Sequence, residues 1–271
     1  MVNTLAKMPV YPAADATIDR PLRERGWVLV PDIVPQADLP GLRAAIHDSI
    51  ADCGRRQVES GATTAPDGTA HHTVGQYPAF DAFLERRYLC DVATRYFGDA
   101  AFILHAFNPV CVQPAGKSYL HQIHRDVRTH GGDFRFMLNV LVMVDPFTLE
   151  NGATHVLSGS HHSATPPVDA AFWADAERLT GPAGSIVLFD SNLWHAAGHN
   201  GSDAPRAALT LSYSRGFVKQ QMDYPRFLGP KYGQAASPAM RQLLGYDAMV
   251  PTSYGEFYRP RETRLYKGNQ G

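Results

Sequence analysis

A histidine and a carboxylate stand two residues apart in the segment 121–126, which reads HQIHRD. Because side chains alternate along an extended chain, His124 and Asp126 project to the same side and can reach one metal ion. A second histidine, His195, ends the apolar segment 188–195. Two histidines and one carboxylate form the ligand set of non-haem iron(II) sites, which leaves coordination positions open. The sequence therefore predicts a metal site made of His124, Asp126 and His195.

The alternative interpretation of His124 and Asp126 is a hydrogen-bonded surface pair without a metal. His195 and Arg206 follow at distances in the sequence that fit a metal centre, and they favour the metal site. His121 is the weaker ligand candidate, because no carboxylate stands two residues after it.

The segment 206–214 offers a partner for an anion beside this site. Alternation places Arg206, Thr210 and Ser212 on one face of a strand, opposite the apolar side chains of Ala207, Leu209, Leu211 and Tyr213. A guanidinium can pair both oxygens of a carboxylate and stays charged at any working pH. We therefore expect this polar face to line a pocket inside a barrel.

The elements that must position these residues change in character near residue 100. Before it, apolar spacing predicts a strand at 26–30, a helix at 37–53, a loop at 54–78 and a helix at 80–97. After it, strands are predicted at 101–113, 134–144, 153–158, 184–190 and 206–214, and a short helix at 237–244. Helices followed by strands without βαβ alternation predict an α+β, mainly β fold with an antiparallel sandwich or barrel.

Composition excludes several classes of protein. The chain has 271 residues, 44% of them hydrophobic, and a formal net charge of −1, which argues against a nucleic-acid partner or an anionic membrane surface. Cys53, Cys90 and Cys111 form no C-x-x-C pair, which favours a reducing compartment. Residues 1–10 lack the apolar core of a secretory signal, and no stretch is apolar for the roughly 18 residues of a membrane span. We expect a cytoplasmic protein.

Four spaced motifs resemble those of one enzyme family. They are HRD at 124–126, ENGATHVLSGSH at 150–161, the segment 184–195 and NGSDAPR at 200–206. Over about residues 20–216, the chain resembles the phytanoyl-CoA dioxygenase-like group of iron(II)- and 2-oxoglutarate-dependent oxygenases. The resemblance implies a double-stranded β-helix (jelly-roll, cupin-like) core at about 100–216. Helices at about 20–98 would support it, within a single domain that spans 1–271.

The resemblance also implies roles for individual residues. His124, Asp126 and His195 match the iron ligands, and Arg206, eleven residues after the distal histidine, matches the anchor of the distal carboxylate of 2-oxoglutarate. One departure is Ala197, where members of the family often carry a serine near the co-substrate.

Further contacts to the co-substrate are expected from Thr210 and Ser212 on the polar face. Asn139 is another candidate to hydrogen-bond the bound oxoacid, since it lies on a core strand and faces away from Val140 and Val142.

The implied reaction consumes dioxygen and 2-oxoglutarate, releases succinate and carbon dioxide, and hydroxylates an unactivated C–H bond. The expected substrate is a small molecule, such as a natural product or an amino-acid-like metabolite, rather than a nucleic acid. Epimerisation, desaturation or cyclisation would use the same site and stays open. A jelly-roll that binds a metal or ligand without catalysis is a further alternative, and the sequence predicts no oligomeric state.

Overall fold

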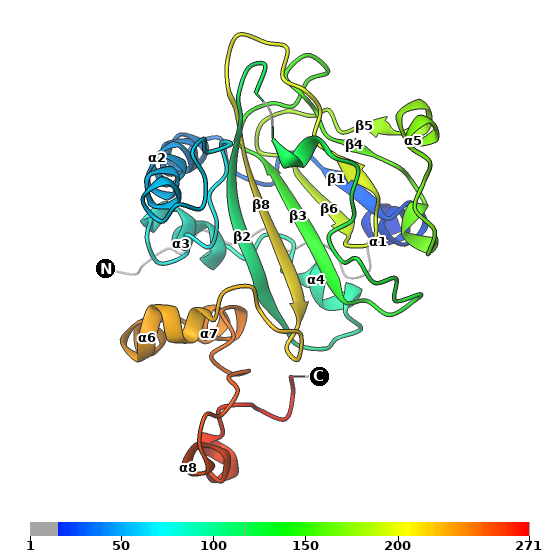
Figure 1. Cartoon of the computed structure of the whole chain (residues 1–271). Coiled ribbons are helices and arrows are strands. Elements are labelled where there is room, and N and C mark those ends of the chain that lie inside the picture. Colours follow the sequence, from blue (N-terminus) through cyan, green and yellow to red (C-terminus); the bar gives the residue numbers. More distant parts are fainter. Residues whose placement is uncertain (1–15, 117, 271) are drawn as a thin grey trace, which may run out of the picture.

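Two antiparallel sheets form the centre of the computed structural model, which describes residues 16–116 and 118–270 (Figure 1). The segment 1–15, in which no secretory signal is predicted, lies outside the described residues. The larger sheet has the strand order β1-β6-β3-β8-β2, and the smaller sheet has the order β5-β4-β7. The strands are β1 Trp27–Val30, β2 Phe102–Val112, β3 Met137–Met143, β4 His155–Val156, β5 Glu177–Arg178, β6 Ile186–Asp190, β7 His195–Ala196 and β8 Arg206–Arg215.

Helices cover one face of the larger sheet and lie below the lower ends of its strands (Figure 1). α2 packs against β2 and β8, α7 packs against β2, and α1 packs against β1 and β6. Figure 1 shows α5 beside the smaller sheet, on the opposite side of the molecule from α2 and α3. The helices are α1 Ala16–Glu24, α2 Leu39–Glu59, α3 Pro78–Glu85, α4 Cys90–Tyr96, α5 Asp169–Asp175, α6 Tyr224–Ala235, α7 Pro238–Leu243 and α8 Tyr254–Phe257.

The alternation of side chains along β3 divides the interior into two apolar cores. Val140 and Val142 enter the larger core, which lies between the sheet and the helices, whereas Leu141 and Met143 enter the core between the two sheets. Asn139 shares the second face, and so it points into the space between the sheets. The strand thus carries a polar side chain into the sandwich at the position where the site is expected.

The expected strand positions agree with the structure more closely than the expected helices do. The helix predicted at 37–53 continues to Glu59, so the following loop is shorter than predicted. The helix predicted at 80–97 is two helices, because Arg87 and Leu89 take left-handed backbone conformations with φ of 52° and 57°. The helices α5, α6 and α8 were not predicted, and α6 has an irregular pattern because Gly229 breaks its helical geometry with φ of 78°.

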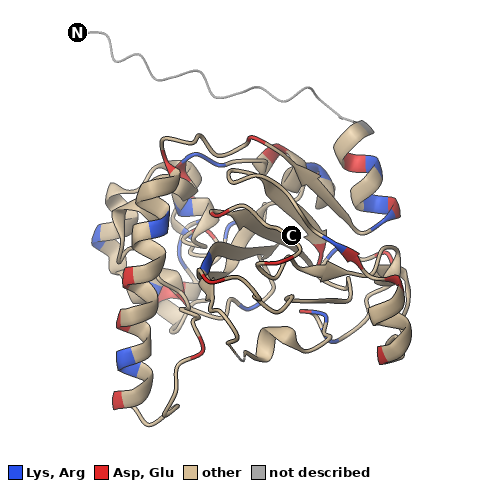
Figure 2. Ribbon diagram, turned by 90° about the horizontal axis from the view of Figure 1, so that it is seen from above, with Lys and Arg blue, Asp and Glu red and all other residues tan. Residues whose placement is uncertain are grey.

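Charge is mixed over the described part of the chain. Figure 2 shows Lys and Arg interspersed with Asp and Glu along the ribbon. Within residues 16–116 and 118–270, no helix combines the length and apolar character needed to cross a membrane.

Candidate active site

The two histidines of the predicted triad lie directly opposite each other on neighbouring segments of chain. The N–H of His124 donates to the carbonyl of His195 at 3.0 Å, and the N–H of His195 donates back to the carbonyl of His124 at 2.9 Å. Such a mutually bonded antiparallel pair sends both side chains to the same side of the backbone. The centroids of the two imidazole rings accordingly lie 4.2 Å apart.

Each of these imidazole rings is oriented by a backbone carbonyl. The Nδ1 atom of His124 lies 2.8 Å from the carbonyl of Gln122, and Nδ1 of His195 lies 3.0 Å from the carbonyl of Leu193. Because a carbonyl only accepts, Nδ1 carries the proton and Nε2 keeps its lone pair for a metal. Burial lowers the pKa of His195, which keeps this ring neutral.

Asp126 completes a group of three metal-binding side chains. His124, Asp126 and His195 offer ligand atoms that all lie within 4.8 Å of one another. Oδ1 of Asp126 lies 3.6 Å from Nε2 of His124, and Oδ2 accepts a hydrogen bond from Nδ2 of Asn139 at 2.7 Å. Two imidazoles whose Nδ1 atoms are bonded to carbonyls and one carboxylate that is itself hydrogen-bonded fit an iron(II) ion with open coordination positions.

Arg206 brings a buried positive charge to the same cavity. Its side chain is 3% exposed, and Nε and Nη1 have no hydrogen-bond partner among the described residues. The guanidinium carbon lies 3.6 Å from the centroid of the Phe147 ring. Burial lowers the pKa of Arg206 to about 10, so the group is still charged at neutral pH. An unpaired buried cation is costly, which fits a site that is completed by an anionic ligand.

All the residues predicted for the site line one cavity of about 220 Å³. Ser212 lies opposite Asn139 in the register of β3 and β8, and the hydroxyl of Thr210 donates to the carbonyl of Asn108 at 3.1 Å. Asn139 donates to a metal-ligand candidate, so its predicted contact with the oxoacid stays a prediction, as do those of Thr210 and Ser212. The seven residues are His124, Asp126, Asn139, His195, Arg206, Thr210 and Ser212.

Several residues that line the cavity were not among the predicted site residues. His71 and Thr69 belong to the predicted loop 54–78, and they line the cavity because residues 69–72 pair with β2. His105 lies within β2 and is 9% exposed. The signal that could have revealed it is an imidazole inside an otherwise apolar strand.

His121, the weaker ligand candidate, and the tyrosines of the C-terminal helices lie outside the residues that line the cavity. His121 stacks on His199 with ring centroids 4.1 Å apart, and its Nδ1 lies 3.2 Å from the carbonyl of Ala197. Tyr224 is buried at the start of α6. Tyr254 is 82% exposed, and it is not among the residues that line the cavity.

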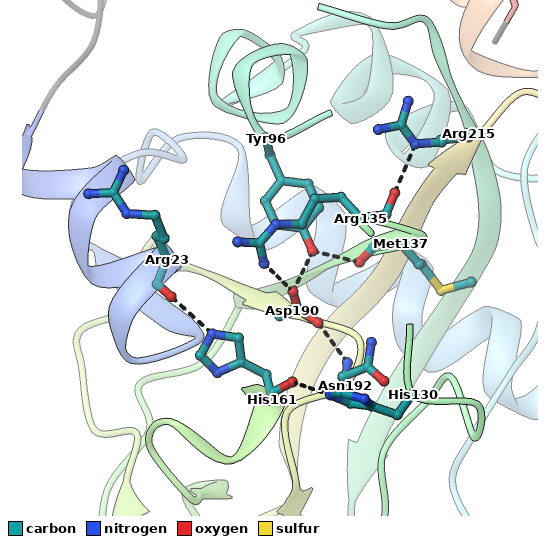
Figure 3. A network of polar contacts seen from close by, with 9 residues as sticks. All are labelled: Arg23, Tyr96, His130, Arg135, Met137, His161, Asp190, Asn192 and Arg215. Carbon is teal, nitrogen blue, oxygen red and sulfur yellow. Dashed lines mark hydrogen bonds and ion pairs between the residues drawn. The ribbon is translucent and has the colours of Figure 1, made fainter. Parts of the chain in front are cut away.

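A polar network fixes the turn between β6 and His195 (Figure 3). Asp190 pairs with Arg135 at 2.7 Å, accepts from the hydroxyl of Tyr96 at 2.7 Å and accepts from the backbone N–H of Asn192 at 2.8 Å. The turn that it holds includes Ser191, whose carbonyl accepts from the N–H of Asp126 at 3.1 Å. Asp190 thus positions the turn that leads to His195 and that bonds the backbone of Asp126, two members of the predicted triad.

Replacement Asp190→Asn is expected to weaken both the fold and the metal site. The side chain of Asp190 is 6% exposed, and the substitution leaves the Arg135 guanidinium without its counter-ion. We expect the free energy of unfolding to fall by about 3 kcal/mol and the affinity for iron(II) to fall about tenfold, measured by chemical denaturation and anaerobic metal titration. Glu177→Gln is the control, since its ion pair with Arg25 is about half exposed and is expected to contribute under about 1 kcal/mol. Equal effects of the two substitutions would contradict this role for Asp190.

Buried histidines predict that the metal-free protein is destabilised by acid. Burial lowers the pKa of both His72 and His155 from 6.5 to about 4. Below pH 6.5 the unfolded chain binds protons that the folded chain does not, so the free energy of unfolding falls between pH 6.5 and 4 and is unaffected by these groups above pH 7. Urea denaturation at pH 7.0, 5.5 and 4.5 measures the slope, which His72→Asn is expected to reduce. Stability that rises on acidification would overturn this assignment.

Comparison with known proteins identifies the family. The phytanoyl-CoA dioxygenase (PhyH) family matches residues 22–208. The uncharacterized protein Rv1501 of Mycobacterium tuberculosis is 30% identical over 257 residues, 91% of this chain and 92% of that protein. Dioxygenase af480 of Aspergillus fumigatus is 26% identical over 237 residues, 82% of this chain and 74% of that protein. The chain belongs to the phytanoyl-CoA dioxygenase family.

Solved structures show the same fold. EctD from S. alaskensis, in a structure with 2-oxoglutarate and 5-hydroxyectoine, has a TM-score of 0.60 at 21% identity and covers 76% of this chain and 79% of that one. The carbocyclase SnoK from nogalamycin biosynthesis has a TM-score of 0.55 at 18% identity and covers 74% and 83%. The predicted family and the predicted mainly β, jelly-roll fold class are confirmed. The predicted enzyme class, a dioxygenase, and the predicted cofactors, iron and 2-oxoglutarate, are also confirmed.

Proposed function

We propose that this dioxygenase hydroxylates an unactivated C–H bond of a small-molecule metabolite, with His124, Asp126 and His195 as the iron ligands. The observation that carries the proposal is the convergence of three ligand atoms within 4.8 Å beside an unpaired, buried guanidinium. The metal-binding group and the guanidinium together fit a co-substrate that chelates the metal at one end and carries a carboxylate at the other.

The residues of the chain bind and orient the reactants. When bound, iron(II) supplies, with 2-oxoglutarate and dioxygen, an oxidation that cleaves a C–H bond and yields succinate and carbon dioxide. Nε2 of each histidine and the carboxylate of Asp126 would hold the metal. Arg206 pairs the distal carboxylate of the co-substrate, while the buried ring of Phe147 shields the guanidinium from water. Asn139 holds Asp126 in place from β3.

The alternative of a jelly-roll without catalysis is disfavoured by the same geometry. A protein that only binds a ligand needs neither a metal site with open coordination positions nor a buried guanidinium that can pair with an oxoacid. The predicted triad and Arg206, which would supply these two features, both line this cavity. Since the mode of reaction depends on where the substrate lies, epimerisation, desaturation and cyclisation are distinguished by analysis of the product rather than by the ligand set.

The test combines a binding signal with turnover. Purified protein with iron(II) and 2-oxoglutarate, without air, is expected to show the visible absorption band of a metal-chelated 2-oxo acid. Admission of air is expected to produce succinate, slowly without substrate and faster with it. The absence of both the band and succinate would refute the proposal.

A further inference from the structure

A second polar group lines the cavity, away from Arg206 along β2. It comprises His105 and Asn108 on β2 and His71 on the segment that pairs with β2, and we call it the β2 wall. Nδ1 of His71 lies 3.2 Å from Oδ1 of Asn108, so these two side chains hold each other in place. The proposed chemistry uses none of the three residues.

A β-bulge lets two consecutive residues of β2, His105 and Ala106, face the cavity. In the register of β2 and β8, Leu104 lies opposite Tyr213 and Ala106 lies opposite Ser212, so His105 is an extra residue in the ladder. Leu104 belongs to the apolar core, and simple alternation would place Ala106 in that core as well. Both His105 and Ala106 instead line the cavity. Bulges next to active sites commonly re-aim a side chain in this way.

The chain after β8 stabilises this bulge. Gln220 donates through Nε2 to the carbonyl of Leu104 at 2.7 Å, and the N–H of Gln221 donates to the carbonyl of His105 at 3.1 Å. The irregular backbone is therefore satisfied by hydrogen bonds rather than left open to water. Gln221 also lines the cavity.

The imidazole that the bulge presents has an unused hydrogen-bonding atom. His105 is 9% exposed, and its Nδ1 has no partner among the described residues. A buried polar atom without a partner costs free energy, which a ligand that bonds to it would recover.

The cavity offers few charges to a substrate. Among the described residues that line it, only Asp126 and Arg206 carry a formal charge, and the proposed function assigns one to the metal and the other to the co-substrate. A charged group of the substrate would be buried here without a counter-ion, which is unfavourable. Uncharged donors and acceptors remain on the β2 wall, surrounded by apolar side chains such as Val110, Met137 and Leu141.

We propose that His105, with His71 and Asn108, binds a hydroxyl or carbonyl oxygen of the substrate, and that the part of the substrate in the cavity is uncharged and mostly apolar. This inference rests on the proposed function, because it assumes that Asp126 and Arg206 are engaged by the metal and the co-substrate. It favours oxygenated, neutral metabolites over amino acids and other molecules that would place an ammonium or carboxylate group beside the metal.

The test compares probes that share one skeleton. Protein loaded with iron(II) and saturating 2-oxoglutarate, without air, is titrated with cinnamyl alcohol, benzylideneacetone, cinnamate and cinnamylamine, and binding is measured by calorimetry. Saturating 2-oxoglutarate keeps cinnamate away from Arg206. The neutral alcohol and ketone are expected to bind at least about tenfold more tightly than the two charged probes. Equal or tighter binding of a charged probe, or no binding of either neutral probe, would overturn the inference.

Variants of His105 separate a hydrogen bond from general damage. His105→Leu is expected to weaken binding of cinnamyl alcohol at least about fivefold while leaving propenylbenzene, which lacks the oxygen, bound as before. His105→Gln restores a neutral hydrogen-bonding group and is expected to recover most of the affinity. His47→Leu, at an exposed position of α2 outside the cavity, is the matched control. Equal losses for the alcohol and the hydrocarbon would show that His105 only supports the fold.

The two proposals fail in different ways. The absorption band of the metal with 2-oxoglutarate is recorded before any probe is added. If that band and succinate formation in air are both missing, the proposed function fails. If the band is present and the neutral probes do not bind preferentially, only the inference about the β2 wall fails.

Discussion

Replacement of Asp126 by alanine is expected to abolish detectable succinate formation, with a loss of more than about 100-fold. In the proposed site, Asp126 is the one ligand of the triad that would bring a negative charge to the divalent cation. Removal of hydrogen-bonded neighbours of metal ligands already costs about 10- to 100-fold, and loss of a ligand itself is expected to cost more. Anaerobic titration with iron(II) and the visible band with 2-oxoglutarate measure the loss of the site directly.

The control for this substitution is Asp133→Ala. Asp133 is exposed and lies close in sequence to the HRD segment without lining the cavity. It is expected to bind iron(II) and form succinate as the unaltered protein does. Normal turnover by Asp126→Ala would mean that the triad is not the metal site.

Replacement Arg206→Met is expected to raise the KM for 2-oxoglutarate at least about 30-fold, because truncation of a buried charge partner typically costs about 2 to 5 kcal/mol. The same change removes a buried guanidinium that has unpartnered nitrogen atoms, so the ligand-free protein should be no less stable than the unaltered one. Thermal unfolding with and without 2-oxoglutarate tests both effects, since bound co-substrate stabilises only a protein that binds it.

Arg206→Lys is the matched variant for charge. A lysine keeps the positive charge but lacks the planar fork, so its KM is expected to lie between those of the unaltered protein and of Arg206→Met. An unchanged KM in both variants, or a large loss of stability in ligand-free Arg206→Met, would show that Arg206 stabilises the fold rather than binds the co-substrate.

The candidate site could be predicted from the sequence because the types of its residues and their spacing within short segments indicate which side chains lie together. The two-residue spacing of His124 and Asp126 gives a common direction in extended chain, and alternation places Arg206, Thr210 and Ser212 on one face. The structure shows these side chains around one cavity. The fold class followed in the same way from strands without regular alternation with helices.

Features that depend on pairing between distant strands could not be predicted in this way. The side of β2 that faces the cavity after His105 follows from the register of β2 against β8, because a single extra residue reverses the alternation from Ala106 onward. The contact of Phe147 with Arg206 and the pairing of Asp190 with Arg135 likewise join segments that have no local signature. The break in the predicted helix 80–97 arises from left-handed backbone at Leu89, which a side chain of this type rarely adopts.

The backbone pairing of His124 with His195 has a practical consequence for how the enzyme acquires its metal. Because backbone hydrogen bonds already align the two imidazoles, we expect the chain to fold and to orient both rings before a metal ion binds. Protein purified in air and stripped by a chelator should accept fresh iron(II) and regain full turnover without a refolding step. Inert divalent substitutes such as zinc should enter by the same route, giving stalled complexes suitable for crystallography with substrate.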